Sequence, residues 1–191
     1  LVQHAQQHCA QVAVSIFVNR LQFGVGEDFD AYPRTLAQDL SLLEAQGVDA
    51  VFVPDEATLY PVPQTIQVTP PAFADWHCRA SRPGHFIGVA TVVTKLLNIV
   101  QPDAAFFGQK DYQQLAIIRA LAEQLNFNTQ IHGIPTVRAD DGLALSSRNG
   151  YLSPEERQIA PQLYQELQHL ARQIASGAQN FLRLTRTAQQ N

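Results

Sequence analysis

A glycine, a lysine and an aspartate stand together directly after a short apolar run in the middle of the chain. Residues 104–107 are Ala-Ala-Phe-Phe, and Gly108, Gln109, Lys110 and Asp111 follow them. Glycine lets the backbone approach a ligand, the start of a helix offers free N–H groups, and lysine adds a positive charge. This combination suits the phosphate chain of a nucleotide. A solvated start of a helix is the alternative interpretation.

Two further polar segments qualify as parts of a site. The loop after the apolar run 12–18 contains Asn19 and Gln22, and Gln114 lies about one helical turn beyond Asp111. In open parallel sheets, ligands bind beyond the carboxyl ends of the strands, where both loops are expected.

The third segment follows the last expected strand. It contains Ser146, Ser147 and Arg148, whose hydroxyl and guanidinium groups can all donate to phosphate oxygens. A plain hydrophilic loop before a helix is the alternative. His4 and His8 have zinc-compatible spacing, but without a third ligand we interpret them as solvent-facing, and no metal site is predicted. His85 is expected to hydrogen-bond the neighbouring helix and not to be catalytic.

The elements that position these residues alternate between strand and helix. Residues 12–18 and 49–53 read as buried strands, and between them Thr35 caps a helix that places Leu36, Leu40 and Leu43 on one face and ends at Gly47. This βαβ pattern predicts an α/β fold with a doubly wound parallel sheet.

The rest of the chain continues the pattern as far as Pro135. An irregular, proline-rich stretch at 60–83 precedes a helix at 87–100, a strand at 104–107, a helix with Leu115, Ile118, Ala122 and Leu125 on one face, and a strand at 129–134. Ser153-Pro154-Glu155-Glu156 is a capping box that starts a final helix to about Ala175, before a polar, poorly patterned tail. We therefore expect one domain over 1–135 and the start of a smaller one over 136–191.

Composition narrows the function. The 191 residues carry a net charge of −4, which argues against a nucleic-acid partner. No apolar run approaches the roughly 18 residues that cross a bilayer. Two cysteines without ligand spacing predict a protein of a reducing compartment, and the absence of methionine suggests a sequence that begins within a longer protein.

The ordered segments together resemble the pantothenate synthetase (pantoate–β-alanine ligase) family along nearly the whole chain. The motifs that carry the resemblance are Ser15-Ile-Phe-Val-Asn19, Gln22-Phe-Gly24, Tyr32-Pro-Arg-Thr35, Arg82-Pro83, His85-Phe86, Phe106-Phe-Gly-Gln-Lys-Asp-Tyr-Gln-Gln114, Pro135-Thr-Val-Arg138, Asp141-Gly-Leu-Ala-Leu-Ser-Ser-Arg-Asn149 and Tyr151-Leu152. The resemblance implies the nucleotidylyltransferase-like Rossmann fold of the HIGH superfamily.

It also implies an ATP-dependent ligation in two steps. Pantoate attacks the α-phosphate of ATP to give pantoyl adenylate and pyrophosphate, and the amine of β-alanine then displaces AMP. Magnesium accompanies ATP, and no redox cofactor is needed. The family also implies a cytoplasmic homodimer with no membrane partner.

The family assigns roles to residues at the matching positions. Gln22 and Gln114 would hold pantoate, with Asn19 near the reacting groups. ATP would contact the following residues: Gly108, Gln109, Lys110, Asp111, Val137, Leu145, Ser146, Ser147 and Arg148. Of these, Lys110 and the segment Ser146–Arg148 would act on the phosphates and are the expected catalytic residues.

The chain departs from the family pattern at its start. Members carry a Met-Gly-x-Leu-His-x-Gly-His type motif whose histidines bind ATP phosphates, whereas this sequence begins at Leu1-Val2, where the segment after that motif would start. The first strand and much of the C-terminal domain are expected to be missing with it. Arg20 stands where proline is common, Leu145 where methionine is common, and Gln109 where glutamate is found.

Two other functions stay open at this stage. One is a related nucleotidylyltransferase that adenylates another small acid, against which Gln22 and Gln114 speak. The other is a non-catalytic remnant that serves as an interaction module. The parent could also be fused to a downstream kinase domain.

The missing histidine motif generates a prediction. The 191-residue chain alone is expected to show little or no ligase activity, because the phosphates lack these ligands, and fusion to an upstream segment with both histidines should restore it. Steady-state assays of both forms, measuring pantothenate, would check this. Normal turnover by the 191-residue chain would show that the role given to the histidines is wrong.

Overall fold

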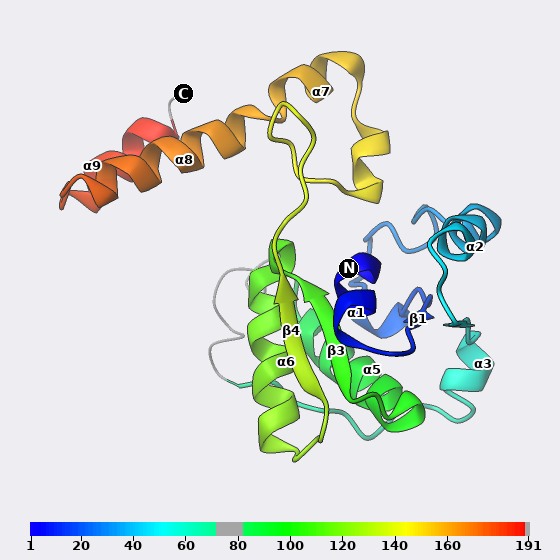
Figure 1. Cartoon of the computed structure of the whole chain (residues 1–191). Coiled ribbons are helices and arrows are strands. Elements are labelled where there is room, and N and C mark those ends of the chain that lie inside the picture. The colour runs from blue at the N-terminus through cyan, green and yellow to red at the C-terminus, as the bar shows by residue number, and fades with distance from the viewer. Residues whose placement is uncertain (72–81, 190–191) are drawn as a thin grey trace. The chain divides into compact units, whose positions relative to one another are not determined.

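The computed structural model describes residues 1–71 and 82–189, and the chain divides into two compact units, Leu1–Pro135 and Thr136–Asn191. The first unit is built from four short parallel strands and their connecting helices, and the second is mainly helical (Figure 1).

The strands of the first unit pair in parallel. β1 (Ala13–Ser15) pairs with β2 (Ala50–Phe52), and β3 (Ala104–Gly108) pairs with β4 (Gln130–Ile134). Within the described residues these are two separate two-stranded sheets. The predicted positions of all four strands are confirmed, although β1 and β2 are only three residues long and shorter than predicted.

Helices cover both faces of the β3–β4 pair. Because side chains alternate along a strand, Ala105, Phe107 and Ile131 face the core formed with α5 (His85–Val100) and α6 (Tyr112–Gln124). The rings of Phe106 and His132 stack on the opposite face, 5.0 Å apart, next to His8 of α1 (Val2–His8). This two-sided covering is the doubly wound arrangement that the sequence predicts (Figure 1).

The hydrophobic core lies mainly between α5 and α6. Ile117 and Ile118 of α6 are fully buried, as is Leu59 at the end of α3 (Glu56–Leu59), a short helix that the sequence analysis missed. Asp55 caps α3 by accepting a hydrogen bond from the Thr58 N–H. The buried residues of α5 are Phe86, Gly88, Val89, Ala90, Thr91, Val92, Val93 and Leu97.

Three predicted apolar positions are exposed instead. In the described part of the chain no residue of α2 (Leu36–Ala45) is buried, and Leu36 and Leu40 are 41% and 38% exposed. Leu125 is 48% exposed, because α6 ends at Gln124 and Asn126 turns the chain with a φ of 54°. The predicted irregular stretch has no helix or strand between residues 60 and 71, and its residues 72–81 lie outside the described part.

The second unit corrects two predictions. Ser153 and Glu156 form the predicted capping box at the start of α7 (Pro154–Ile159), but the helix does not continue to Ala175. It breaks before α8 (Gln162–Ala175), because Pro161 has no N–H to donate to the helix. The tail is also helical, since Asn180 caps α9 (Phe181–Ala188) and Leu184 is buried.

One glycine generates a stability prediction. A Cβ on Gly88 would lie 2.3 Å from the carbonyl oxygen of Leu21, so Gly88→Ala should lower the free energy of unfolding by about 2–3 kcal/mol through overpacking. Denaturant unfolding followed by circular dichroism measures this.

The matched control is Gly150→Ala, where a Cβ meets no described atom within 4 Å. It should change stability by at most about 0.5 kcal/mol. Equal stability of the two variants would contradict the close contact at Gly88.

Candidate functional site

The first polar corner follows β1 and lies directly on α5. Asn19 precedes the 3-10 turn η1 (Arg20–Gln22), and this turn packs against the first turns of α5. The approach is possible only because Gly88 has no side chain there. The turn therefore has a fixed position on the longest buried helix of the unit.

A chain of amide and hydroxyl groups links this corner to α3 and α5. Asn19 is only 3% exposed, and its Nδ2 donates to the carbonyl oxygen of Gly88 at 3.1 Å and to Oε1 of Gln22 at 3.2 Å. The hydroxyl of Tyr60 donates to Oδ1 of Asn19 at 2.8 Å. The buried amide is thus fully hydrogen-bonded, as burial of a polar group requires.

An arginine and a histidine hold the backbone of Gln22. The Nδ1 of His85 lies 2.8 Å from the carbonyl oxygen of Gln22, and an Nη of Arg82 also donates to this oxygen at 3.4 Å. The Arg82 guanidinium makes a bidentate ion pair with Glu27, with N–O distances of 2.7 and 2.6 Å. Bidentate pairs of this kind fix geometry as well as charge.

Burial lowers the pKa of His85, with the Arg82 guanidinium acting in the same direction, against the opposing hydrogen bond to Gln22. A neutral ring fits its contacts, because Nδ1–H can donate to the carbonyl while Nε2 accepts from Arg82 Nη1 at 3.3 Å. The Arg82 side chain in turn lowers the pKa of Glu27, first through its hydrogen bonds. His85 was predicted to cap or hydrogen-bond the helix that follows it, whereas in the structure its ring bonds the carbonyl of Gln22 at the end of η1.

The second polar corner follows β3. Gly108 ends the strand, Gln109–Asp111 form the 3-10 turn η3, and α6 begins at Tyr112 with Gln114 in its first turn. Lys110 and Asp111 are exposed. The N-cap residues of η3 and α6, Gly108 and Asp111, make no side-chain cap hydrogen bond, and the positive end of the α6 dipole lies at this corner.

The two corners are connected through packed helices. η1 packs on α5, α5 packs against α6, and η3 leads into α6. The turn that carries Gln22 and the turn that carries Lys110 are therefore held by one pair of helices.

The third segment lies in the second unit and forms a hairpin. Arg138 and Ala144 make an antiparallel bridge, and the N–H of Leu145 donates to the carbonyl of Val137 at 3.0 Å. The Arg138 guanidinium stacks on the ring of Tyr164, 3.5 Å from its centre, and donates to the carbonyl of Gly142. Val137 and Leu145 are 62% and 55% exposed, so the hairpin presents two apolar side chains to solvent.

The two serines and the arginine follow the hairpin. Ser146 caps the 3-10 turn η4 (Ser147–Tyr151), since its Oγ accepts a hydrogen bond from the N–H of Arg148 at 3.3 Å. The hydroxyl hydrogen of Ser146 stays available for donation. An ion pair between Arg157 and Asp141 joins the hairpin to α7 and lowers the pKa of Asp141.

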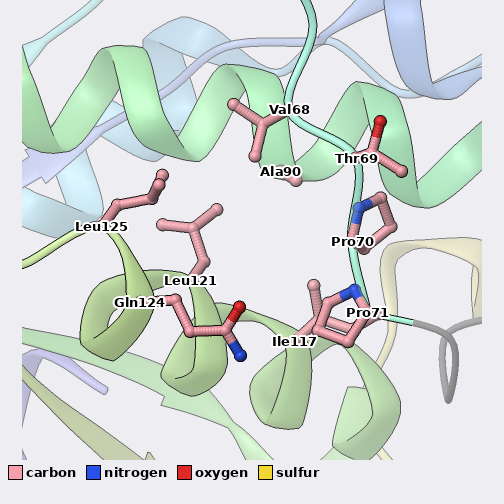
Figure 2. A pocket seen from close by; sticks show the side chains of 9 residues that line it. All are labelled: Val68, Thr69, Pro70, Pro71, Ala90, Ile117, Leu121, Gln124 and Leu125. Atoms are coloured by element: carbon pink, nitrogen blue, oxygen red, sulfur yellow. The ribbon is translucent and has the colours of Figure 1, made fainter.

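A small hollow elsewhere in the first unit is not part of this site. It encloses about 60 Å³ between the segment Val68–Pro71 and the helices α5 and α6. Figure 2 shows its lining, which is mostly apolar and includes none of the predicted site residues. Sites for small molecules typically enclose about 300 Å³ or more, so this hollow is too small for such a ligand.

Two further observations concern the histidine pair and the helices of the chain. His4 and His8 are exposed, and no group of three or more His, Cys, Asp or Glu side chains that could hold a metal occurs in residues 1–71 and 82–189. In the same ranges, no helix has both the length and the apolar character needed to span a membrane.

Sequence reasoning missed several residues that build the first corner. Tyr60, Arg82 and Gly88 contact Asn19 or Gln22 across separations of 41, 60 and 69 residues. Arg82 was noted only as part of the resemblance. No local spacing signals such contacts.

Known proteins share both sequence and fold with this chain. The profile of the pantoate–β-alanine ligase family matches residues 1–191. A pantothenate synthetase of Ectopseudomonas mendocina is 59% identical, with 99% of this chain and 67% of that protein covered. One from Neisseria meningitidis serogroup C is 57% identical, with 100% and 69% covered.

Solved structures agree. The pantothenate synthetase of Thermus thermophilus superimposes with a TM-score of 0.94 at 46% identity, with 98% of this chain and 69% of that chain covered. The pantoate–β-alanine ligase of Francisella tularensis, solved with β,γ-ATP and β-alanine, gives a TM-score of 0.84 at 40% identity, covering 88% and 65%. This chain spans about two thirds of the length of these relatives.

The parallel strand pairs with helices on both faces and the polar loops after β1 and β3 define the nucleotidylyltransferase-like α/β class, as the solved neighbours do. Within that class, the chain belongs to the pantoate–β-alanine ligase family.

The lowered pKa of His85 generates a prediction. In the unfolded chain His85 binds a proton below about pH 6.5, whereas in the folded chain it binds one only at a lower pH. The free energy of unfolding should therefore fall as the pH drops from about 6.5 to the lower pKa of the folded chain. His85→Asn keeps a donor near the Gln22 carbonyl but cannot titrate. It should flatten this fall by up to about 1.4 kcal/mol per pH unit.

Urea unfolding at several pH values between 7 and 5 measures the effect. His169→Asn is the matched control, since that ring is exposed on α8 and lies outside the Arg82–Gln22 contacts. The same pH dependence in wild type and His85→Asn would show that His85 does not stay neutral in the folded chain.

Proposed function

We propose that this chain carries the pantoate and nucleotide sites of an ATP-dependent ligase that condenses pantoate with β-alanine to pantothenate. The observation that carries the proposal is that two polar corners, one with Gln22 and one with Lys110, stand on helices that pack together, since η1 packs on α5 and α5 packs against the helix that follows η3. Family membership supports the choice of substrates.

The first corner supplies neutral donors. Gln22 is held through its backbone, and Gln114 stands in the first turn of α6, so the two amides can bind the hydroxyls and carboxylate of pantoate. The Asn19 amide donates a hydrogen bond to Oε1 of Gln22 and so holds that side chain. The balanced Arg82–Glu27 pair adds no net charge to this corner.

The second corner supplies charge and N–H groups for ATP. Gly108, Gln109, Lys110 and Asp111 lead directly into α6, and Lys110 places an exposed ammonium at the start of this helix. From the second unit, Ser146, Ser147 and Arg148 would donate to phosphate oxygens, and Val137 and Leu145 would offer apolar contacts to the adenine.

The reaction has two steps, and the protein contributes mainly by aligning the reacting groups. The pantoate carboxylate attacks the α-phosphorus and pyrophosphate leaves with its electron pair, giving pantoyl adenylate. The neutral amine of β-alanine attacks the acyl carbon, loses a proton, and AMP leaves. Holding two anions together requires fixed cations and donors around the phosphate, and alignment supplies much of the rate.

Magnesium would enter with ATP as part of the substrate. A hard cation bound largely by phosphates and water needs few protein ligands, which fits a corner that offers the carboxylate of Asp111. We also propose a homodimer, supported by the exposed Leu36, Leu40 and Leu42 of α2, and a cytoplasmic location, where ATP is available.

The role of Lys110 provides the test. Lys110→Met should weaken ATP binding about 10- to 100-fold, since a hydrogen bond to a charged group contributes about 1.5–3 kcal/mol, and should leave pantoate affinity within about threefold. Titration calorimetry with each ligand measures both.

Arg183→Met is the control, because it removes the same charge from an exposed position of α9. A wild-type chain that binds neither ligand would point to the interaction module instead. Equal binding of other small acids would favour the related nucleotidylyltransferase.

A further inference from the structure

We propose that Tyr60 and Asn19 are positioning residues that fix the polarity of the Gln22 amide, so that Gln22 always presents its NH₂ group to the substrate. This inference rests on the proposed function for the identity of the ligand. The hydrogen-bond geometry that carries it does not depend on any ligand.

One group in this network has a polarity that cannot change. The carbonyl oxygen of Gly88 can only accept a hydrogen bond, and it lies 3.1 Å from the amide of Asn19. The Asn19 atom that faces it must therefore be the donor, Nδ2. Turning the amide over would place two oxygens in contact inside a buried site, since Asn19 is 3% exposed.

The fixed amide of Asn19 then sets both of its neighbours. Oδ1 of Asn19 faces the hydroxyl of Tyr60, which donates to it at 2.8 Å. The second hydrogen of Nδ2 is donated to the Gln22 amide, so Gln22 must accept it with its oxygen. The distance from Asn19 Nδ2 to Gln22 Oε1 is 3.2 Å. The Nε2 of Gln22 is thereby turned away from Asn19.

A fixed NH₂ group selects its ligand by chemistry. It donates to an oxygen lone pair, so a carboxylate or hydroxyl oxygen fits, and a ligand that offers only a donor at this point does not. Both hydrogens and the oxygen of the Asn19 amide are used in hydrogen bonds to Gly88, Gln22 and Tyr60. The role of Asn19 is therefore to orient Gln22, and it needs no direct contact with substrate.

Tyr60 suits the donor role. Burial raises its pKa to about 12, with the nearby Glu56 carboxylate acting in the same direction, so its hydroxyl keeps its proton at physiological pH. Its ring packs next to Phe17, and the Lys95 ammonium lies 4.7 Å from its centre. These contacts hold the hydroxyl in place beside Asn19.

The backbone of Gln22 is held independently. His85 and Arg82 both bond its carbonyl oxygen, so the residue is fixed at the main chain and at the side chain. The backbone carbonyl and the side-chain Oε1 of Gln22 are both hydrogen-bonded, so its outward NH₂ group is the part that can bind a ligand.

The first experiment needs no ligand. In the full chain, side-chain amide hydrogen exchange measured by NMR should show slow exchange for the Asn19 NH₂ and at least tenfold faster exchange for the Gln22 NH₂. Tyr60→Phe should speed exchange at Asn19 by tenfold or more. Protected Gln22 hydrogens beside freely exchanging Asn19 hydrogens would overturn the proposal.

The second experiment tests the outward polarity with pantoate by calorimetry. Gln22→Glu keeps the acceptor but removes the donor, and it should weaken pantoate binding more than 30-fold. Gln168→Glu is the matched control on the exposed face of α8, and it should change affinity less than twofold. Pantoate binding by Gln22→Glu within threefold of wild type would overturn the proposal.

Tyr60→Phe separates positioning from general stability. Pantoate affinity should fall about three- to tenfold while ATP affinity stays unchanged, whereas an equal loss of both would show that Tyr60 serves only the fold. If the wild-type chain binds no pantoate, the proposed substrate is wrong, and the exchange experiment still decides the polarity of the network.

Discussion

The contact between η1 and α5 is the constraint on which the first polar corner depends. Gly88 allows the carbonyl of Leu21 to approach the helix, and the same residue offers its own carbonyl to Asn19. One position therefore sets both the location of the turn and the polarity of its amides. Because α5 supplies much of the hydrophobic core, this helix is a firm base for the corner that packs on it.

The two corners of the first unit use different electrostatics. Near Gln22 the charges cancel, since Arg82 is paired with Glu27 and His85 is kept neutral by burial and by that arginine. Near Gly108 the exposed Lys110 ammonium stands beside the exposed Asp111 carboxylate at the start of α6. Neutral donors suit a small hydroxy acid, and an ammonium at the positive end of a helix dipole suits phosphates, so an acidic chain with a net charge of −4 can still bring two anions together.

Local signals predicted the strands, the main helices and the polar loops of this chain. They failed where a distant residue decides the outcome. Leu36 and Leu40 have the spacing of a buried face, but no neighbouring element covers them in the described chain. Tyr60 reads as the start of an irregular stretch, yet its hydroxyl reaches Asn19, 41 residues away. The break at Pro161 was readable from the sequence, because a proline inside a helical pattern interrupts it.

The second unit repeats the same principle with other residues. Gly142, with a φ of 95°, lets the hairpin turn lie against Tyr164, and Arg138 stacks on that ring while bonding the Gly142 carbonyl. The segment that carries Ser146 and Arg148 therefore starts from a braced hairpin. In both units a glycine admits a close contact and an arginine holds the backbone beside it. For a reaction in which the protein contributes alignment more than covalent chemistry, such bracing is the physical basis of activity, because a donor displaced by about 1 Å loses much of its effect.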